Sequence, residues 1–272
     1  MIVTMKEILD RAQTGGYGVV APNIFNETTI RGAVEAAVEL ETPLILDALY
    51  ADNPDLITLS KFVYELARDV KIPVALNQDH GATFAEAIRA IQANFTSIMV
   101  DRSQLPLEEN IAQVSELVRI AHTVNVSVES ELGHVGSGSN YEAERDAGLT
   151  DPEVAKEFVD RTGVDCLAVA VGTAHGAYTG EPHLDFERLR AIRAKVSVPL
   201  VLHGGSGTGE ENLRRAAKEG VTKINISTDL LRAGVENAQN ATLYTYYNAM
   251  REGYKEKLKY YMGLTGQIGK AW

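Results

Sequence analysis

The sequence predicts a (β/α)8 barrel, in which eight parallel strands alternate with helices. Two observations lead to this fold: apolar strand-like runs recur eight times, and segments of helical periodicity separate them. A third is that the notable polar residues stand at or just past the ends of these runs. The length of 272 residues suits one barrel domain covering residues 1–272, with a C-terminal helical extension.

The strand-like runs are nearly continuous in apolar character, as expected for strands that are buried on both faces. In order they are GVVAPN (18–23), PLILDAL (43–49), PVALNQ (73–78), TSIMVD (96–101), NVSVESEL (125–132), DCLAVAV (165–171), PLVLHG (199–204) and TKINIS (222–227). An open doubly wound sheet is the alternative. It fits less well, because no Gly-x-Gly-x-x-Gly follows the first run.

Helical periodicity is clearest in three of the intervening segments. They are ETTIRGAVEAAVELE (27–41), PLEENIAQVSELVRIAHTV (106–124) and DPEVAKEFVDRT (151–162). Asp151 before Pro152 is typical of a helix start, with an N-cap followed by proline at the first helical position. The alternation of strands and helices therefore favours a parallel barrel.

Composition excludes several classes of function. The net charge of −11 argues against nucleic-acid binding, which relies on clustered Lys and Arg. The single cysteine, Cys166, excludes an internal disulfide and fits a cytoplasmic protein. The N-terminal MIVTMKEILD lacks a signal core, and no stretch is long enough to span a bilayer. We therefore expect no membrane partner.

Three histidines follow apolar runs: His80 in NQDHG, His175 in GTAHG and His203 in LHGGSG. If the runs are parallel strands, all three imidazoles emerge at the same end of the barrel, where such folds keep their active sites. Three imidazoles without a fourth protein ligand are typical of a catalytic zinc, which keeps one coordination position open.

Two further features accompany the histidines. The Gly-Gly-Ser-Gly turn at residues 204–207 can offer backbone N–H groups to a phosphate, and Asp79 supplies a carboxylate beside His80. A metal site, a phosphate-binding turn and a nearby carboxylate together predict carbonyl chemistry on a phosphorylated substrate. The long loop 134–150, with three glycines, is a candidate mobile lid.

At these residues the chain resembles the class II, zinc-dependent ketose-phosphate aldolases of the fructose- and tagatose-bisphosphate aldolase group. The matching stretches run collinearly from about residue 6 to 270 and are APNIFN, DHG, SIMVD, VESELG, TDPEVAKEFVDRTGVDCLAVAVGTAHGAY, LDFERL, PLVLHGGSG, KINIST and GQIGKA. AVAVGTAHG and LHGGSG are the most specific of them.

The resemblance implies a role for each matching residue. The zinc ligands would be His80, His175 and His203, and Asp79 would handle the proton of the C4 hydroxyl. Asp101 and Glu131 can hold a second cation, divalent or monovalent. Substrate and its phosphate, as in dihydroxyacetone phosphate, would be bound by Asn23, Gly176, Gly204, Gly205, Ser206, Asn225, Ser227 and Thr228. The bound zinc would act as a Lewis acid on the substrate carbonyl.

The sequence departs from the family at the aldehyde side of the site. The usual Gln-x-Ser after strand two is Asp47-Ala48-Leu49, and the usual Asp-Gly-Ser is Asp101-Arg102-Ser103. The loop acids that relay a proton fall at about Gly138-Ser139, with Glu142 and Glu144 close behind. A guanidinium suits an anion, so we expect Asp47 and Arg102 at the aldehyde end and an aldehyde with an unusual anionic group, such as a sulfonate.

The expected function is reversible aldol cleavage of a ketose 1-phosphate or 1,6-bisphosphate-like sugar to dihydroxyacetone phosphate and an aldehyde, by a homo-oligomer (dimer or tetramer). A standard fructose- or tagatose-1,6-bisphosphate aldolase is the alternative. A non-catalytic sugar-phosphate-binding protein, a metal-dependent hydrolase and a Schiff-base aldolase using Lys223 are further alternatives. The Schiff-base chemistry would leave three histidines unexplained.

Overall fold

The computed structural model describes residues 1–144, 146 and 148–272. The barrel strands are β1 (Val19–Pro22), β2 (Leu44–Leu49), β3 (Val74–Gly81), β4 (Ser97–Val100), β5 (Ser127–Leu132), β7 (Cys166–Val169), β9 (Leu200–Leu202) and β10 (Val221–Ile226). Each lies within or overlaps one of the eight apolar runs, with small differences at the ends. The eight recurring apolar runs therefore correspond to the eight strands of the barrel.

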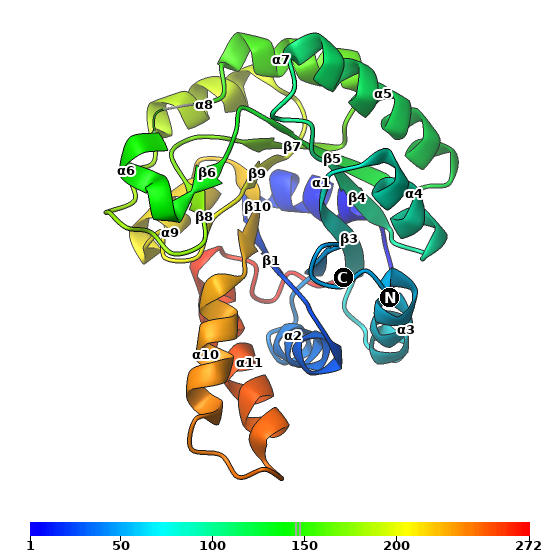
Figure 1. The fold of residues 1–272 in the computed structure, drawn as a ribbon, viewed down its shortest axis with the longest axis vertical. Coiled ribbons are helices and arrows are strands. Elements are labelled where there is room, and N and C mark those ends of the chain that lie inside the picture. The colour runs from blue at the N-terminus through cyan, green and yellow to red at the C-terminus, as the bar shows by residue number, and fades with distance from the viewer. Residues whose placement is uncertain (145, 147) are drawn as a thin grey trace.

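All eight strands pair in parallel, in the order β1-β10-β9-β7-β5-β4-β3-β2. The two outer strands of this order meet where Asn23 bridges Asp47, and the Ile24 amide donates to the Asp47 carbonyl at 2.8 Å. The sheet is thus a nearly closed barrel, and the predicted (β/α)8 fold is confirmed (Figure 1).

Helices separate the strands and cover the outside of the barrel. They are α2 (Glu27–Glu39), α3 (Leu56–Ala67), α4 (Phe84–Gln92), α5 (Leu107–Thr123), α7 (Pro152–Thr162), α8 (Phe186–Lys195) and α9 (Glu210–Lys218), and α10 (Thr228–Ala238) follows the last strand. Asp151 caps α7 as predicted, because its Oδ1 accepts from the amides of Glu153 and Val154 at 2.8 and 3.1 Å. No helix in the described residues has the length and apolar character needed to cross a membrane.

The barrel interior changes from apolar to polar along its axis. Helix α1 (Met5–Gly15) closes the amino-terminal end, where Met5, Ile8 and Leu9 pack on inward-facing Val19 and Ile45. Side chains alternate along a strand, so positions two residues further on also face inward. Charged side chains occupy this next level of the barrel interior, and a cavity opens above them.

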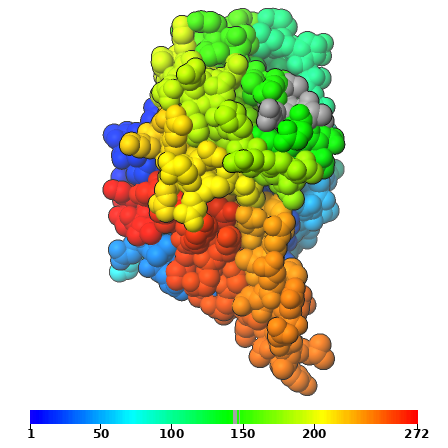
Figure 2. Space-filling view, turned by 90° about the vertical axis from the view of Figure 1, so that its left-hand side faces the viewer, coloured from blue at the N-terminus to red at the C-terminus, as the bar shows by residue number. Residues whose placement is uncertain are grey.

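The C-terminal extension consists of α10 and α11 (Tyr246–Leu264), which form a hairpin that projects from the barrel (Figures 1 and 2). Tyr254 is buried and donates to the Asn23 carbonyl at 2.8 Å, whereas Tyr244 at the hairpin tip is 97% exposed. The GQIGKA stretch then connects β1 with the residue before β2. The side chain of Gln267 accepts from the Val20 amide at 2.6 Å and donates to the Pro43 carbonyl at 3.3 Å.

Candidate active site

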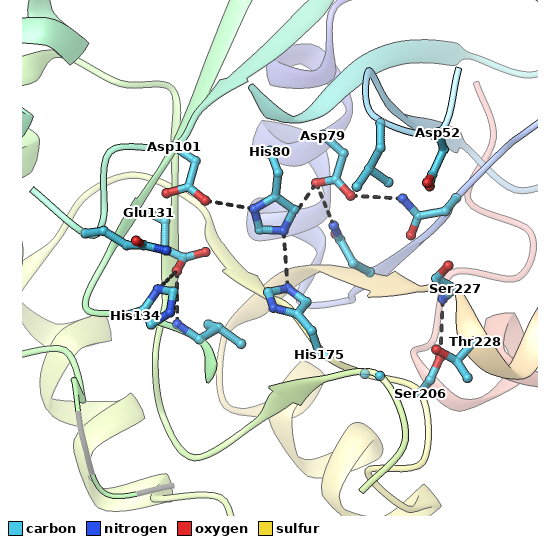
Figure 3. A pocket seen from close by; sticks show the side chains of 18 residues that line it. Asp52, Asp79, His80, Asp101, Glu131, His134, His175, Ser206, Ser227 and Thr228 are labelled. Carbon is cyan, nitrogen blue, oxygen red and sulfur yellow. Dashed lines mark hydrogen bonds and ion pairs between the residues drawn. The ribbon is translucent and has the colours of Figure 1, made fainter. Parts of the chain in front are cut away.

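A cavity of about 460 Å³ opens at the carboxyl ends of the barrel strands (Figure 3). Thirteen of the residues predicted for the site line it: Asn23, Asp79, His80, Asp101, Glu131, His175, Gly176, Gly204, Gly205, Ser206, Asn225, Ser227 and Thr228. His203 lies fully buried at its base. Residues from β1 to β10 therefore converge because parallel strands present all their carboxyl ends at one rim.

The three predicted zinc ligands lie close enough to share one ion. Nε2 of His80 is 3.2 Å from Nε2 of His175 and 3.0 Å from Nδ1 of His203. A tetrahedral ion about 2.0–2.1 Å from each nitrogen would separate the nitrogens by about 3.3 Å. The donor set and its spacing thus fit a single metal ion such as zinc.

Asp79 and His80 both reach the site because the strand alternation is broken between them. The register of β3 on β4 shifts between Gln78 and Gly81, and His80 has a φ of +46°. Neighbouring strand residues normally point to opposite faces, so this irregularity turns both side chains toward the cavity. Gly81 has no room for a Cβ, which would stand 2.6 Å from the Met99 carbonyl oxygen. A strained backbone of this kind is common at functional sites.

The carboxylates around the imidazoles make the site attractive to cations. Burial disfavours the charged form of His80, but Asp79, Asp101 and Glu131 outweigh burial and raise the pKa of His80 to about 10. Burial and the neighbouring imidazoles lower the pKa of His175 to about 3, so its ring is neutral at pH 7. His175 is therefore in the neutral state that a metal ligand requires, and His80 has to release its proton when a metal binds.

A second group of ligands lies next to the three histidines. Asp101 Oδ2 is 2.9 Å from Nδ1 of His80, and a ligand atom from each of His80, Asp101 and Glu131 fits one small cluster. Oε2 of Glu131 is buried without a hydrogen-bond partner and lies 3.6 Å from Nδ1 of His203. An unpaired buried carboxylate oxygen is costly, so its position fits a group that binds a cation.

Asp79 is held between two asparagines. Its Oδ2 accepts from Nδ2 of Asn23 at 2.9 Å, and its Oδ1 accepts from Nδ2 of Asn225 at 3.2 Å. Burial alone would raise the pKa of Asp79, but the charges of His80, Lys223 and His203 outweigh it and hold that pKa below its ordinary value. The carboxylate is therefore ionised and fixed, as a proton acceptor needs to be.

The opposite end of the cavity has the features of a phosphate site. Gly204 has a φ of +68°, and a Cβ there would stand 2.2 Å from the Ala174 carbonyl oxygen. Ser206 Oγ accepts from the amides of Ser227 and Asp229 at 3.2 and 3.3 Å, which ties the glycine turn to the first turn of α10. A helix N-terminus with a glycine turn favours an anion.

The two residues assigned to the aldehyde side do not line the cavity. Asp47 is fully buried beneath it, with Oδ2 2.9 Å from Nζ of Lys223. Arg102 lines a separate adjoining cavity, and its Nη1 donates to the carbonyls of Gly81 and Asp101 at 2.8 and 2.6 Å. Its Nε donates to Gln113 at 2.7 Å. The guanidinium supports the backbone behind His80, so the geometry does not support contact with the aldehyde.

Replacing Arg102 with alanine should therefore lower stability and leave substrate selectivity unchanged. Loss of buried hydrogen bonds to two carbonyls should reduce the free energy of unfolding by about 1–3 kcal/mol. Urea unfolding measures this change, and KM is compared for ketoses with and without a second anion. A selective rise in KM for the anionic ketose would restore Arg102 to the aldehyde side.

Sequence reasoning missed several groups around the site. Leu49, Asp52, Gln104, His134 and Val135 also line the cavity. Glu129 is fully buried, and its Oε1 is 2.8 Å from Nε2 of His203. The sequence does contain a sign that Glu129 faces the site, because alternation along β5 places it on the same face as Glu131.

The loop predicted as a lid is folded against the His175 segment. Within it lie β6 (Gly136–Ser137), a 3-10 turn (Gly138–Asn140) and α6 (Tyr141–Glu144), and β6 pairs with β8 (Ala174–His175). Residues 145 and 147 lie outside the described part. Gly138 stands where the family's relay acids are expected, and its carbonyl accepts from the Thr179 amide at 3.1 Å. That the loop moves stays a prediction.

Comparison with known proteins places this geometry in context. A model of the family "Fructose-bisphosphate aldolase class-II" matches residues 3–270. The crystal structure of the YdjI aldolase from Escherichia coli K12 is similar, at 33% identity and a TM-score of 0.90, covering 100% of both chains. A protein from Coccidioides immitis, assigned as a fructose-1,6-bisphosphate aldolase, shares 26% identity at a TM-score of 0.90, over 98% of this chain and 97% of that one. A fructose-bisphosphate aldolase from Campylobacter jejuni shows the same fold, at 22% identity and a TM-score of 0.80, over 99% and 96%.

Proposed function

Because this chain belongs to the class-II fructose-bisphosphate aldolase family and is therefore an aldolase, we propose that it cleaves a ketose 1-phosphate reversibly to dihydroxyacetone phosphate and an aldehyde, with zinc as cofactor. One observation carries the proposal. Three imidazoles, an ionised aspartate and a phosphate-type turn line or underlie a single cavity.

His80, His175 and His203 would hold the zinc. When bound, it supplies a Lewis acid for the substrate carbonyl, where negative charge develops as the carbon–carbon bond breaks. Asp79 accepts the proton of the C4 hydroxyl, and the amides of Asn23 and Asn225 keep its carboxylate oriented. Asp101 and Glu131 would hold a second cation.

The phosphate end fixes the substrate for this proton transfer. Gly176, Gly204 and Gly205 line the cavity without side chains, which leaves their backbone open to the ligand, and the hydroxyls of Ser206 and Thr228 lie beside the start of α10. Orientation of this kind can contribute several kcal/mol, on the order of 7 or more in favourable cases. The phosphate site thus increases the rate of cleavage as well as the affinity for the substrate.

The aldehyde end of the cavity decides which ketose is used. Besides the residues already assigned, the described lining of the cavity offers a carboxylate (Asp52), an amide (Gln104), an imidazole (His134) and the apolar Leu49 and Val135, with no lysine or arginine among these residues. The expectation of a sulfonate-bearing aldehyde depended on Arg102, which lies elsewhere. The proposal therefore covers ketose 1-phosphates generally, with fructose- and tagatose-1,6-bisphosphate as the alternative substrates.

Lys223 does not fit Schiff-base chemistry, which needs a neutral amine. Its Nζ is buried 2.9 Å from both Asp47 Oδ2 and Glu129 Oε2. Burial alone would lower the pKa of Lys223, but the neighbouring carboxylates outweigh it and raise that pKa above its usual value. Borohydride treatment with substrate should accordingly leave the enzyme active.

A panel of ketose 1-phosphates and 1,6-bisphosphates tests the proposed function, with release of dihydroxyacetone phosphate as the readout. We expect turnover of at least one ketose, complete loss after EDTA, and recovery with about one zinc per chain. Turnover that survives metal removal would exclude zinc chemistry. Ligand binding without turnover across the panel would favour a sugar-phosphate-binding protein.

We also propose that the chain is a homo-oligomer in which the α10–α11 hairpin contacts another subunit. The hairpin exposes Leu243 (94%), Tyr244 (97%) and Tyr247 (70%), and Figure 2 shows its tip projecting from the body of the molecule. Exposed apolar groups that cluster in this way commonly mark an interface. Light scattering gives the mass in solution, and a monomer at micromolar concentration would contradict this assignment.

A further inference from the structure

A layer of charged side chains lies inside the barrel directly below the histidines. Lys223, Asp47 and Glu129 are each fully buried, and they come from β10, β2 and β5. Lys223 Nζ is 2.9 Å from an oxygen of each carboxylate. We refer to these three residues as the buried charge layer.

Stability alone does not account for this layer. Transferring each ion from water costs several kcal/mol, and apolar residues of similar volume are often as stable or more stable in its place. Apolar side chains, such as Val19 and Ile45, do fill the interior one level below. The charged residues therefore have another role, and their contacts indicate what it is.

The contacts of the layer lead from Lys223 to a metal ligand. Glu129 Oε2 accepts from Lys223 Nζ at 2.9 Å, and Oε1 lies 2.8 Å from Nε2 of His203. On the far side of Lys223, Asp47 Oδ1 accepts from Nδ2 of Asn77 at 2.8 Å. Each carboxylate is thereby held from two sides, so Glu129 has little freedom to leave His203.

The orientation of His203 follows from the chemistry of a carboxylate. An ionised carboxylate only accepts hydrogen bonds, so Nε2 of a neutral His203 has to carry the proton. Its Nδ1 is then an unprotonated acceptor, and it is Nδ1 that lies 3.0 Å from Nε2 of His80. An outer carboxylate that accepts a hydrogen bond from one ring nitrogen fixes the tautomer of a metal-binding histidine in this way.

We propose that Glu129, anchored by Lys223 and Asp47, is a positioning residue that fixes the Nε2–H tautomer of His203 and so presents Nδ1 to the metal. The inference rests on the proposed function for the identity of the metal as zinc. It assigns to Asp47 a place in this layer, separated from the metal ligand His203 by Lys223 and Glu129, in place of a contact with the aldehyde.

Two matched variants separate positioning from a general effect of charge. Glu129→Gln and Asp47→Asn make the same carboxylate-to-amide change beside the same lysine, but only Glu129 contacts His203. The glutamine amide can donate as well as accept, so it no longer dictates the tautomer. Zinc affinity, measured by competition with a chromophoric chelator, should fall about 10- to 100-fold in Glu129→Gln and less than about threefold in Asp47→Asn.

A spectroscopic readout works without any substitution in the layer. In metal-free wild-type protein labelled with ¹⁵N-histidine, at a pH where the ring is neutral, the His203 signals should show Nε2–H alone. His203→Asn identifies those signals by removing them. A mixture of tautomers in Glu129→Gln is also expected.

Two outcomes overturn the proposal: Nδ1–H in the wild-type protein, or equal loss of zinc affinity in the two variants. If neither variant folds, the wild-type spectrum decides alone. If the wild-type protein binds no zinc, the proposed cofactor fails, and the spectrum still reports separately whether Glu129 sets the tautomer.

Discussion

Replacing His175 with alanine should abolish both zinc binding and aldol cleavage while leaving the barrel folded. His175 supplies one of three clustered imidazole nitrogens, and its neighbours His80 and His203 alone cannot complete the site. Loss of Lewis-acid stabilisation worth several kcal/mol corresponds to at least ~10³-fold in rate. Metal content by atomic emission, kcat/KM with the best ketose and circular dichroism together measure the three expected results.

The chain provides a matched control in His122, another histidine paired with a carboxylate. Its Nε2 is 2.8 Å from Asp165 Oδ2, in a small cavity that includes Ser127 at the start of β5, opposite the active-site end. His122→Ala should keep zinc and activity, because His122 lies at the opposite end of the barrel from the site. Full activity of metal-free His175→Ala protein would end the zinc hypothesis.

The fold could be predicted from the sequence because barrel strands are buried on both faces. Burial on both faces makes each strand a continuous apolar run, so eight runs at regular spacing define the barrel before any contact is known. The same regularity predicts the end of the barrel at which polar residues collect. His80, His175 and His203 could therefore be grouped from three separate parts of the chain.

The details of the site could not be predicted, because they depend on local backbone irregularity. Regular alternation along β3 would send Asp79 and His80 to opposite faces. Only the register shift and the positive φ of His80 bring both to the cavity. The sequence shows the Asp-His pair but gives no sign of this irregularity beyond the glycine at position 81.

Arg102 and Asp47 show a second limit of sequence reasoning. Asp47 lies in the second half of β2 and Arg102 follows β4, both toward the end of the barrel that holds the site, so a substrate contact was the natural expectation. A long side chain can turn toward backbone carbonyls, as Arg102 does, and a short carboxylate can pair with a buried lysine. The position of a residue in the sequence predicts its height along the barrel axis. It does not predict the group with which its side chain forms a hydrogen bond or an ion pair.

The second large effect is expected at Asp79. Asp79→Ala should retain zinc, because Asp79 is not among the clustered imidazoles, but should lose about 10²–10⁴-fold in cleavage, the range for a general base. The remaining hydrogen-bond donors, Asn23 and Asn225, would then face a space without their acceptor. Zinc content and kcat with the best ketose give the two numbers.

A partial reaction distinguishes loss of the base from damage to the site. Asp79 acts on the C4 hydroxyl, which dihydroxyacetone phosphate lacks, so exchange of its C3 proton with deuterated solvent should continue in Asp79→Ala. Asn23→Ala provides the comparison: it keeps the carboxylate and removes one of its two supports, so its cleavage rate should fall less. Equal loss of cleavage and exchange in Asp79→Ala would mean that Asp79 maintains the site, and near wild-type cleavage would mean that another group is the base. The expected pattern, cleavage lost and exchange kept, follows only if the carboxylate between two asparagines takes the C4 proton.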